Sequence, residues 1–368
     1  AEYMGAHTIY RTMTWFSLLL LLSIVSLSQS FSLLNFADQW CERTPNPEPC
    51  KYLMRQNPKK LLPMGKKEFR KVSIELAMQR AKAAHLLARS LEPNCRNQRE
   101  RYAWADCVEL YEEAIVHINE TLNPEAKHSE FDVQTWLSTA LTDLETCRTS
   151  FLDLGVGDYM LPLMSNNVTK LVSNSLSLGN VKQFLEADSY KNGFPQWVTA
   201  GDRKLLQASS TAPNLVVAQD GSGNYRTIKE AVEAASERKE TTRFVIHVRK
   251  GVYKENIEIG RKMKNIMLVG DGMQRTIITG SRSVGGGFTT FRSATLAVTG
   301  SGFIARDLTI RNTAGPQNHQ AVALRSGSDL SVFYRCSFEG YQDTLYVHSQ
   351  RQFYRECYIF GTVDFIFG

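Results

Sequence analysis

The hydrophobic positions of the chain follow two different periods. In residues 37–187, apolar side chains recur every three or four residues, which places them on one face of an α-helix. From Leu215 onward the chain has short β-type runs, such as residues 244–248 and 266–269, separated by glycines. The pattern predicts a helical region followed by a β-rich region, with one further helix over residues 227–236.

The helical half has regular apolar spacing and clear breaks. Residues 65–92, 129–150 and 165–187 share the pattern, which is clearest in Trp104, Val108, Tyr111, Ile115, Ile118 and Leu122. Pro93 and Pro124 interrupt it. We therefore expect an antiparallel helix bundle with short connections over residues 31–190.

An apolar run near the N-terminus indicates secretion. Residues 15–27 follow Arg11 and are fewer than the roughly 20 apolar residues of a membrane-spanning helix. We expect a signal peptide over residues 1–30, removed near Ser30. A retained signal anchor is the alternative. We also expect Met4 to be the natural start and residues 1–3 to be artefactual.

Secretion makes disulfides plausible for the seven cysteines. Cys41 and Cys50 flank a proline-rich segment and could close a small loop. Cys107 and Cys147 lie 40 residues apart on successive predicted helices and could join them. The sequons at Asn119 and Asn167 are candidate glycosylation sites that fit the same compartment.

The β-rich half contains a repeat of 21 residues. Residues 332–346 align with residues 353–367, so that Cys336 falls on Cys357 and Asp343 on Asp364. Such a repeat is typical of a solenoid, whose coils stack about 4.8 Å apart. The two cysteines could form a disulfide or remain a ladder of free thiols.

The repeat brings together residues suited to acyl chemistry. Asp343 and Asp364 should project from adjacent coils, and two carboxylates so close raise the pKa of one of them. Gln342 and Gln320 lie 22 residues apart, and their amides can donate to an oxyanion. The set predicts attack on a carbonyl, whereas aspartates that only cap turns are the structural alternative.

Composition and charge narrow the function. Of 368 residues, 43% are hydrophobic and 22% charged, which excludes a disordered or polytopic membrane protein. The net charge of +6 arises from Gln207 onward, where 20 basic residues meet 14 acidic ones. A basic half favours a polyanionic partner, which could be a nucleic acid, an acidic lipid or an acidic polysaccharide, although charge that only solubilises the surface explains it too.

The helical half resembles the plant invertase/pectin methylesterase inhibitor family. The resemblance rests on the two cysteine pairs and on the words around Cys147, notably residues 132–141 (DVQTWLSTAL). It implies a four-helix bundle stapled by disulfides, which either inhibits an enzyme or serves only as a structural pro-region.

A linker is expected over residues 191–213, where the composition changes. It contains Arg203, Lys204, Leu205 and Leu206, which resemble the site at which subtilisin-like proteases cut plant pectin methylesterase proproteins. We therefore expect a processing site between the helical and β-rich domains.

The β-rich half, residues 214–368, resembles the plant pectin methylesterases. The resemblance rests on residues 220–228 (DGSGNYRTI), 315–324 (GPQNHQAVAL), 340–346 (GYQDTLY) and 361–368 (GTVDFIFG). It implies a right-handed parallel β-helix in the cell wall that hydrolyses methyl esters of pectin without metal or cofactor. No nucleic-acid partner is expected.

The resemblance assigns roles by position. Asp364 would be the nucleophile, Asp343 the general acid and base, and Gln320 and Gln342 the oxyanion-stabilising pair. Gln320 would also contact substrate. Tyr346 and Phe367 would flank the sugar, although core packing or an aromatic ladder explains them too.

The sequence departs from that family at its end. Family members continue past the position of Gly368 to a Gly-Arg-Pro-Trp word, so we expect half of the β-helix here and little esterase activity.

Two other functions stay open. The helical bundle could act as a separate inhibitor module, or the chain could be another β-helix pectinase, since paired carboxylates also suit glycoside hydrolysis.

Overall fold

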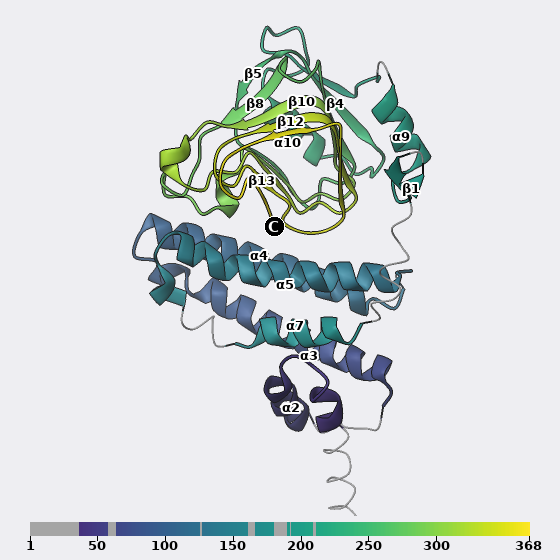
Figure 1. The fold of residues 1–368 in the computed structure, drawn as a ribbon, viewed down its shortest axis with the longest axis vertical. Helices are drawn as coiled ribbons and strands as arrows, with labels where there is room; N and C mark the ends of the chain where they lie inside the picture. Colours follow the sequence, from purple (N-terminus) through teal and green to yellow (C-terminus); the bar gives the residue numbers. More distant parts are fainter. Residues whose placement is uncertain are drawn as a thin grey trace, which may run out of the picture. The chain divides into compact units, whose positions relative to one another are not determined.

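The computed structural model describes residues 37–57, 64–125, 127–160, 166–179, 190–191, 193–208 and 211–368 (Figure 1). The expected signal peptide lies outside these residues. The chain divides into two compact units. Among the described residues, the first unit comprises residues 37–57, 64–79 and 167–179, and the second comprises residues 80–125, 127–160, 166, 190–191, 193–208 and 211–368.

The first unit is helical. It holds α2 (Pro47–Gln56), α7 (Val168–Ser177) and the first part of α3 (Lys66–Ser90). A disulfide joins Cys41 to Cys50 across 5.5 Å between Cα atoms. The side chain of Asn174 on α7 accepts from Asn46 N at 2.9 Å and donates to Asn46 O at 2.8 Å. These bonds fix α7 to the start of α2.

A helical pair opens the second unit. Helix α4 (Gln98–Leu122) begins at Asn97, whose side chain caps Glu100 N. Helix α5 (Glu130–Asp153) begins with a capping box between Ser129 and Asp132, which satisfies exposed N–H groups at its first turn. The Cys107–Cys147 disulfide joins the two helices. Both disulfides that were expected in the helical half are therefore present.

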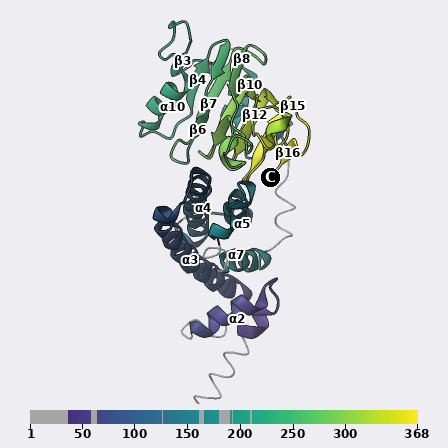
Figure 2. The same ribbon diagram turned by 90° about the vertical axis from the view of Figure 1, so that its left-hand side faces the viewer.

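The second unit also contains a parallel β-helix, which confirms the expected β fold. Figure 2 shows its strands side by side along the solenoid. Nine strands form one sheet: β3 (Leu215–Val217), β4 (Phe244–Val248), β5 (Gly251–Lys254), β7 (Ile266–Gly270), β8 (Thr276–Gly280), β10 (Ile304–Asn312), β12 (Ser331–Glu339), β14 (Gln352–Arg355) and β15 (Tyr358–Phe360). Five form the other: β6 (Ile257–Ile259), β9 (Leu296–Val298), β11 (Leu324–Ser326), β13 (Leu345–Tyr346) and β16 (Ile366–Phe367).

The register of the strands confirms the 21-residue repeat. Ser331 pairs with Gln352, and Leu345 pairs with Ile366. The interior between the sheets is apolar, and Phe333 stacks on Tyr354 with ring centroids 4.8 Å apart. Helix α10 (Ile228–Ser236) packs its buried face on this core, as residues 227–236 predicted.

The segment expected as a linker is partly folded. Strands β1 (Tyr190–Lys191) and β2 (Phe194–Pro195) pair antiparallel, and residues 200–207 form helix α9 (Ala200–Gln207). The segment is therefore not extended at this helix, where Leu206 is fully buried against the outer face of the nine-stranded sheet, and its role as a linker stays a prediction.

Short 3-10 turns complete the fold: η2 (Glu92–Asn94), η3 (Gly157–Met160), η4 (Phe291–Ser293) and η5 (Pro316–Asn318). Among the helices of the described ranges, none has the length and apolar character needed to cross a bilayer.

Candidate catalytic site

The two candidate catalytic aspartates lie in turns on adjacent coils. Asp343 precedes β13 and Asp364 precedes β16, two strands that pair in parallel. Asp343 N donates to Val363 O at 3.1 Å, which locks the two turns together. Both aspartates have left-handed backbone angles, with φ of 63° and 48°, a region that aspartate tolerates better than most residues.

Burial distinguishes the two carboxyl groups. Asp343 is buried, whereas Asp364 is exposed. Burial, followed by the negative charges of Asp364 and Asp153, raises the pKa of Asp343 to about 7. Asp343 is therefore protonated at mildly acidic pH and can donate a proton.

The two candidate glutamines lie one register position apart. Ala321 N donates to Gln342 O at 3.1 Å, so Ala321 lies beside Gln342 on the adjacent coil. Gln320 comes directly before Ala321 in the sequence and is therefore offset from Gln342 by one position. Gln320 O accepts from Val284 N at 2.9 Å. These contacts hold the backbones, and both side chains remain half-exposed. Their oxyanion role stays a prediction.

The aromatic pair stacks beside the aspartates. The rings of Tyr346 and Phe367 are 4.2 Å apart and nearly parallel. Tyr346 Oη lies 3.3 Å from Thr146 Oγ1 of α5, and burial raises the pKa of Tyr346 to about 12. Phe367 is half-exposed, so part of one of the two rings is open to solvent, and the contact of this pair with a sugar stays a prediction.

Sequence reasoning missed Asp153, at the end of α5. Its Oδ2 accepts from Thr290 N at 3.0 Å, and its charge helps to raise the pKa of Asp343. Thr290 is 137 positions away along the chain. No periodicity or motif connects residues across that separation, so the sequence carried no signal for the contact.

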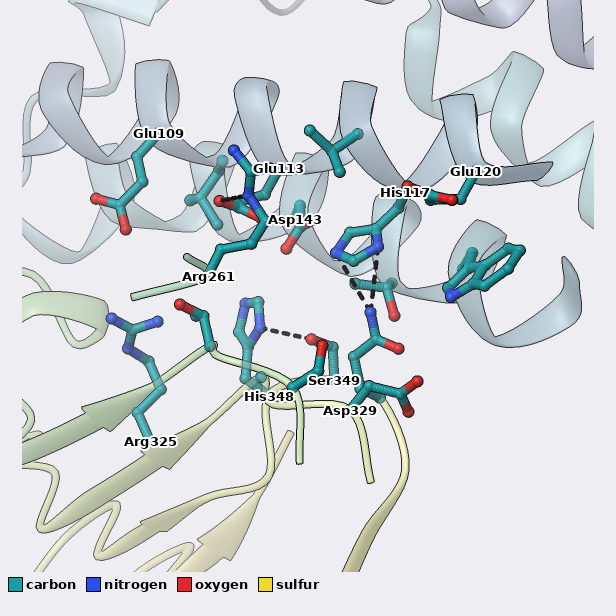
Figure 3. Close-up of a pocket in the computed structure, with 18 of the residues that line it drawn as sticks. Glu109, Glu113, His117, Glu120, Asp143, Arg261, Arg325, Asp329, His348 and Ser349 are labelled. Atoms are coloured by element: carbon teal, nitrogen blue, oxygen red, sulfur yellow. Dashed lines mark hydrogen bonds and ion pairs between the residues drawn. The ribbon is translucent and has the colours of Figure 1, made fainter. Parts of the chain in front are cut away.

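The second unit contains a pocket of about 370 Å³, whose lining residues are drawn in Figure 3. Helices α4 and α5 supply several acidic side chains, whereas the β-helix supplies basic ones together with the acidic Asp329. The labelled residues are Glu109, Glu113, His117, Glu120, Asp143, Arg261, Arg325, Asp329, His348 and Ser349.

Burial shifts the titration of this pocket. It raises the pKa of Glu109 to about 7 and lowers the pKa values of His117 and His348 to about 4 and about 3. Glu113 forms an ion pair with Arg261 at 2.9 Å. Both histidines are consequently neutral at ordinary pH.

Cys336 and Cys357 are free thiols, which corrects their inclusion among the disulfide cysteines. Their strands are in register, as the repeat predicted. However, Cys336 Sγ donates to Tyr334 O at 3.5 Å and Cys357 Sγ to Phe333 O at 3.4 Å. The thiol ladder, the other alternative left open by the sequence, is what the structure contains.

The remaining candidate positions are the two sequons and the expected processing site. The two sequon residues, Asn119 and Asn167, are exposed, and their glycosylation stays a prediction. Arg203 to Leu206 lie in α9, and cleavage there also stays a prediction.

Comparison with known proteins identifies the family. Residues 214–368 match the family described as "Pectinesterase", and residues 35–178 match "Plant invertase/pectin methylesterase inhibitor". The chain is 60% identical over 355 residues to "Pectinesterase 2" of Citrus sinensis, covering 95% of this chain and 68% of that protein. The chain belongs to the family of plant pectinesterases that carry an inhibitor-type region.

Other pectinesterase relatives are similar over a smaller share of their length. "Probable pectinesterase/pectinesterase inhibitor 17" of Arabidopsis thaliana is 59% identical over 329 residues, which are 89% of this chain and 63% of the relative. The structure titled "Pectin methylesterase from Carrot" is 59% identical, with a TM-score of 0.42, over 44% of this chain and 50% of that one. The chain thus spans about two thirds of these curated pectinesterases.

Proposed function

We propose that this protein is a pectin methylesterase that converts methyl-esterified polygalacturonate to pectate and methanol. The observation that carries the proposal is the stacking of Asp343 on Asp364 in a chain of the pectinesterase family. A buried protonated carboxyl beside an exposed carboxylate supplies an acid and a nucleophile at one site.

In the proposed first step, the Asp364 carboxylate attacks the C6 ester carbonyl. The oxyanion that forms accepts hydrogen bonds from the amides of Gln320 and Gln342. The C–O bond to the methoxy group then breaks, and the proton of Asp343 passes to it to give methanol. An anhydride between Asp364 and the galacturonate remains.

In the second step, ionised Asp343 removes a proton from water. The hydroxide adds to the galacturonyl carbonyl, and the anhydride bond breaks to release a C6 carboxylic acid, which loses its proton to solvent. Asp364 is ionised and Asp343 protonated again, so the cycle closes. Phe367 and Tyr346 would contact the sugar ring, and Gln320 the substrate as well.

Methanol release by the natural protein that contains these residues tests this proposal. Gln342→Ala should lower kcat by about 10²–10³-fold, the usual loss for one oxyanion donor. Gln219→Ala, at an exposed glutamine outside the site, is the matched control. Equal rates for both variants would contradict the oxyanion assignment.

We further propose that a polypeptide limited to residues 1–368 releases little methanol. Among the described residues no hydrogen bond holds the Asp364 side chain, and its neighbours Phe365 and Ile366 are 39% and 49% exposed. A nucleophile that is not held in place loses the rate advantage of fixed geometry. Methanol release by this polypeptide at the rate of an active pectinesterase would refute this.

A second candidate function is inhibition by the helical region. The match to the inhibitor family and the Asp153–Thr290 bond beside Asp343 favour it. The purified chain, added to an active pectin methylesterase, should slow methanol release, and an unchanged rate would leave the region a structural pro-region.

The proposed setting is the plant cell wall. Support comes from the apolar run over residues 15–27 and from the family of the relatives. Pectin would be the substrate, and a subtilisin-like protease would cut after Leu206. N-terminal sequencing of secreted protein tests both cleavages, expected near Ser30 and Leu206.

A further inference from the structure

Thr344 follows Asp343 directly in the chain and bridges the two turns that carry the candidate aspartates. The residue is fully buried, and its hydroxyl donates to Tyr341 O at 3.1 Å and to Phe360 O at 3.0 Å. Tyr341 belongs to the turn that carries Asp343. Phe360 ends β15, directly before the turn that carries Asp364. Because a hydroxyl has a single hydrogen, the two carbonyls share it across the neighbouring coils.

Both acceptor carbonyls also receive a backbone N–H from the opposite coil. Thr362 N donates to Tyr341 O at 2.8 Å, and Gly340 N donates to Phe360 O at 3.1 Å. The side chain of Thr344 thus joins a buried network of backbone groups that holds the two turns together. Hydrogen bonds in such a network strengthen one another, so the loss of one donor weakens the rest.

Two glycines leave room for this hydroxyl. Gly340 and Gly361 occupy equivalent positions in the 21-residue repeat. A Cβ atom on Gly340 would lie 2.9 Å from Thr344 Oγ1, and a Cβ atom on Gly361 would lie 2.5 Å from it. A larger residue at either position would therefore displace the hydroxyl. The residue equivalent to Thr344 on the next coil is Phe365, which has no hydroxyl.

We propose that Thr344 is a positioning residue, whose hydroxyl holds the turn of Asp343 against the turn of Asp364. The inference rests on the proposed function, in which an acid and a nucleophile act on one ester. Their relative position decides whether the proton of Asp343 reaches the departing methoxy group, and a small displacement of a reacting group costs much of the rate. Thr344 would act through Asp343, so its loss should lower kcat more than it raises KM.

Carbon-13 NMR of the Asp343 carboxyl in the full 368-residue chain tests the positioning. Thr344→Val keeps the branched shape of the side chain and removes the hydroxyl. The turns should then separate, which weakens the effects of burial and of the Asp364 charge. These effects, with the charge of Asp153, raise the pKa of Asp343 to about 7, so that pKa should fall. Thr344→Ser, which retains the hydroxyl, should titrate as the wild type does.

Thr295→Val is the matched control. Thr295 occupies the equivalent position two coils earlier, as the strand register shows. It is fully buried, and its hydroxyl donates to Arg311 O at 3.0 Å, outside the two turns of the aspartates. This variant loses a buried hydrogen bond as Thr344→Val does. Both should therefore melt at a lower temperature, whereas only Thr344→Val should change the Asp343 titration.

Gly340→Ala displaces the hydroxyl without replacing Thr344. The three atoms nearest the added methyl group, chain neighbours apart, all belong to the Thr344 side chain. This variant should lower the pKa of Asp343 as Thr344→Val does. Circular dichroism and thermal melting report whether each variant folds, and Gly340→Ala decides if Thr344→Val does not.

The kinetics of methanol release by the natural protein that contains these residues supply a second readout. Thr344→Val should lower kcat about tenfold or more and leave KM within about twofold of the wild-type value. Thr344→Ser should restore most of the rate, and Thr295→Val should match the wild type.

Four results would overturn the proposal. They are an Asp343 titration that neither Thr344→Val nor Gly340→Ala changes, an equal change in Thr295→Val, no rescue by Thr344→Ser, and an unchanged kcat in Thr344→Val. The NMR titration does not require turnover. Methanol release that depends on Asp364 would still support the esterase if the positioning role failed, and failure of the esterase would leave the titration result standing.

Discussion

At the scale of single residues, the candidate site consists of two aspartates whose environments differ. The 21-residue spacing stacks them, and the backbone bond from Asp343 N to Val363 O keeps the turns together. Burial then raises the pKa of Asp343 to about 7, while the Asp364 side chain stays in contact with solvent. The 21-residue spacing brings the two aspartates together, and the burial of Asp343 distinguishes their proposed roles.

Replacing the charge of Asp364 should change the titration of Asp343. Asp364→Asn removes one of the negative charges that raise the pKa of Asp343, so that pKa should fall from about 7 but stay above its ordinary value because burial remains. Carbon-13 NMR of labelled aspartate carboxyls measures this.

Asp153→Asn is the comparison for that titration. It removes the weaker of the two charges and should lower the pKa of Asp343 less than Asp364→Asn does. An Asp343 titration that neither variant moves would show that burial alone controls it.

The sequence predicted this pair but not its surroundings. A repeat reports which residues stack, so Asp343, Asp364 and the Tyr346–Phe367 row could be found from spacing. The contact of Asp153 with Thr290 depends on tertiary packing, as does the burial of Arg325. Neither leaves a local pattern in the sequence.

At the scale of elements, α9 shows how a segment that resembles a linker becomes ordered. Thr199 caps its first turn, and Leu206 is buried in the cluster that includes Met267. The buried Arg306 donates to the carbonyls of Leu205, Leu206 and Ala208. The candidate cleavage site is therefore held within folded structure, and cutting there requires α9 to open.

Opening α9 should expose the cleavage site. Leu206→Asp would place a charge in an apolar contact, at a cost of about 3 kcal/mol or more, and should speed cutting by subtilisin between residues 203 and 208. Limited proteolysis with mass spectrometry measures the rate. Leu86→Asp, at a leucine that is 66% exposed, should leave that rate unchanged. Equal rates in both variants would contradict the packing account.

The pair of helices α4 and α5 carries buried acids that should make stability depend on pH. Burial raises the pKa of Glu109 to about 7 and that of Asp143 well above its ordinary value, while Asp106 and Glu113 are raised too. Between about pH 6.5 and 7.5 the folded protein holds protons that the unfolded chain has lost. Stability therefore falls as pH rises, by at most about 1.4 kcal/mol per pH unit for each held proton.

His117 and His348 act in the opposite direction only below the ordinary histidine pKa, since burial keeps them neutral in the folded state. Melting temperatures measured above that range isolate the acids. The double variant Glu109→Gln/Asp143→Asn should flatten the decline, whereas Glu145→Gln, at an exposed residue, should not. An equally steep decline in the double variant would contradict the assignment.

At the scale of the whole molecule, the change of hydrophobic period marks the change of architecture. The segment in which apolar residues recur every three or four positions forms the helices and contains the two disulfides. The segment of short β-type runs separated by glycines forms the stacked parallel strands. The division into compact units does not follow that change, because α4 and α5 belong to the unit that contains the β-helix. Periodicity identifies elements, but tertiary contacts decide which elements form one unit.

The central claim is that Asp364 is the nucleophile of a pectin methylesterase. Methanol release from highly esterified pectin by the natural protein that contains these residues, compared with its Asp364→Ala variant, tests it most directly. We predict a loss of about 10³-fold or more, as for other removed nucleophiles, and no loss in Asp220→Ala, an exposed aspartate outside the site. Methanol release retained by Asp364→Ala would contradict the claim.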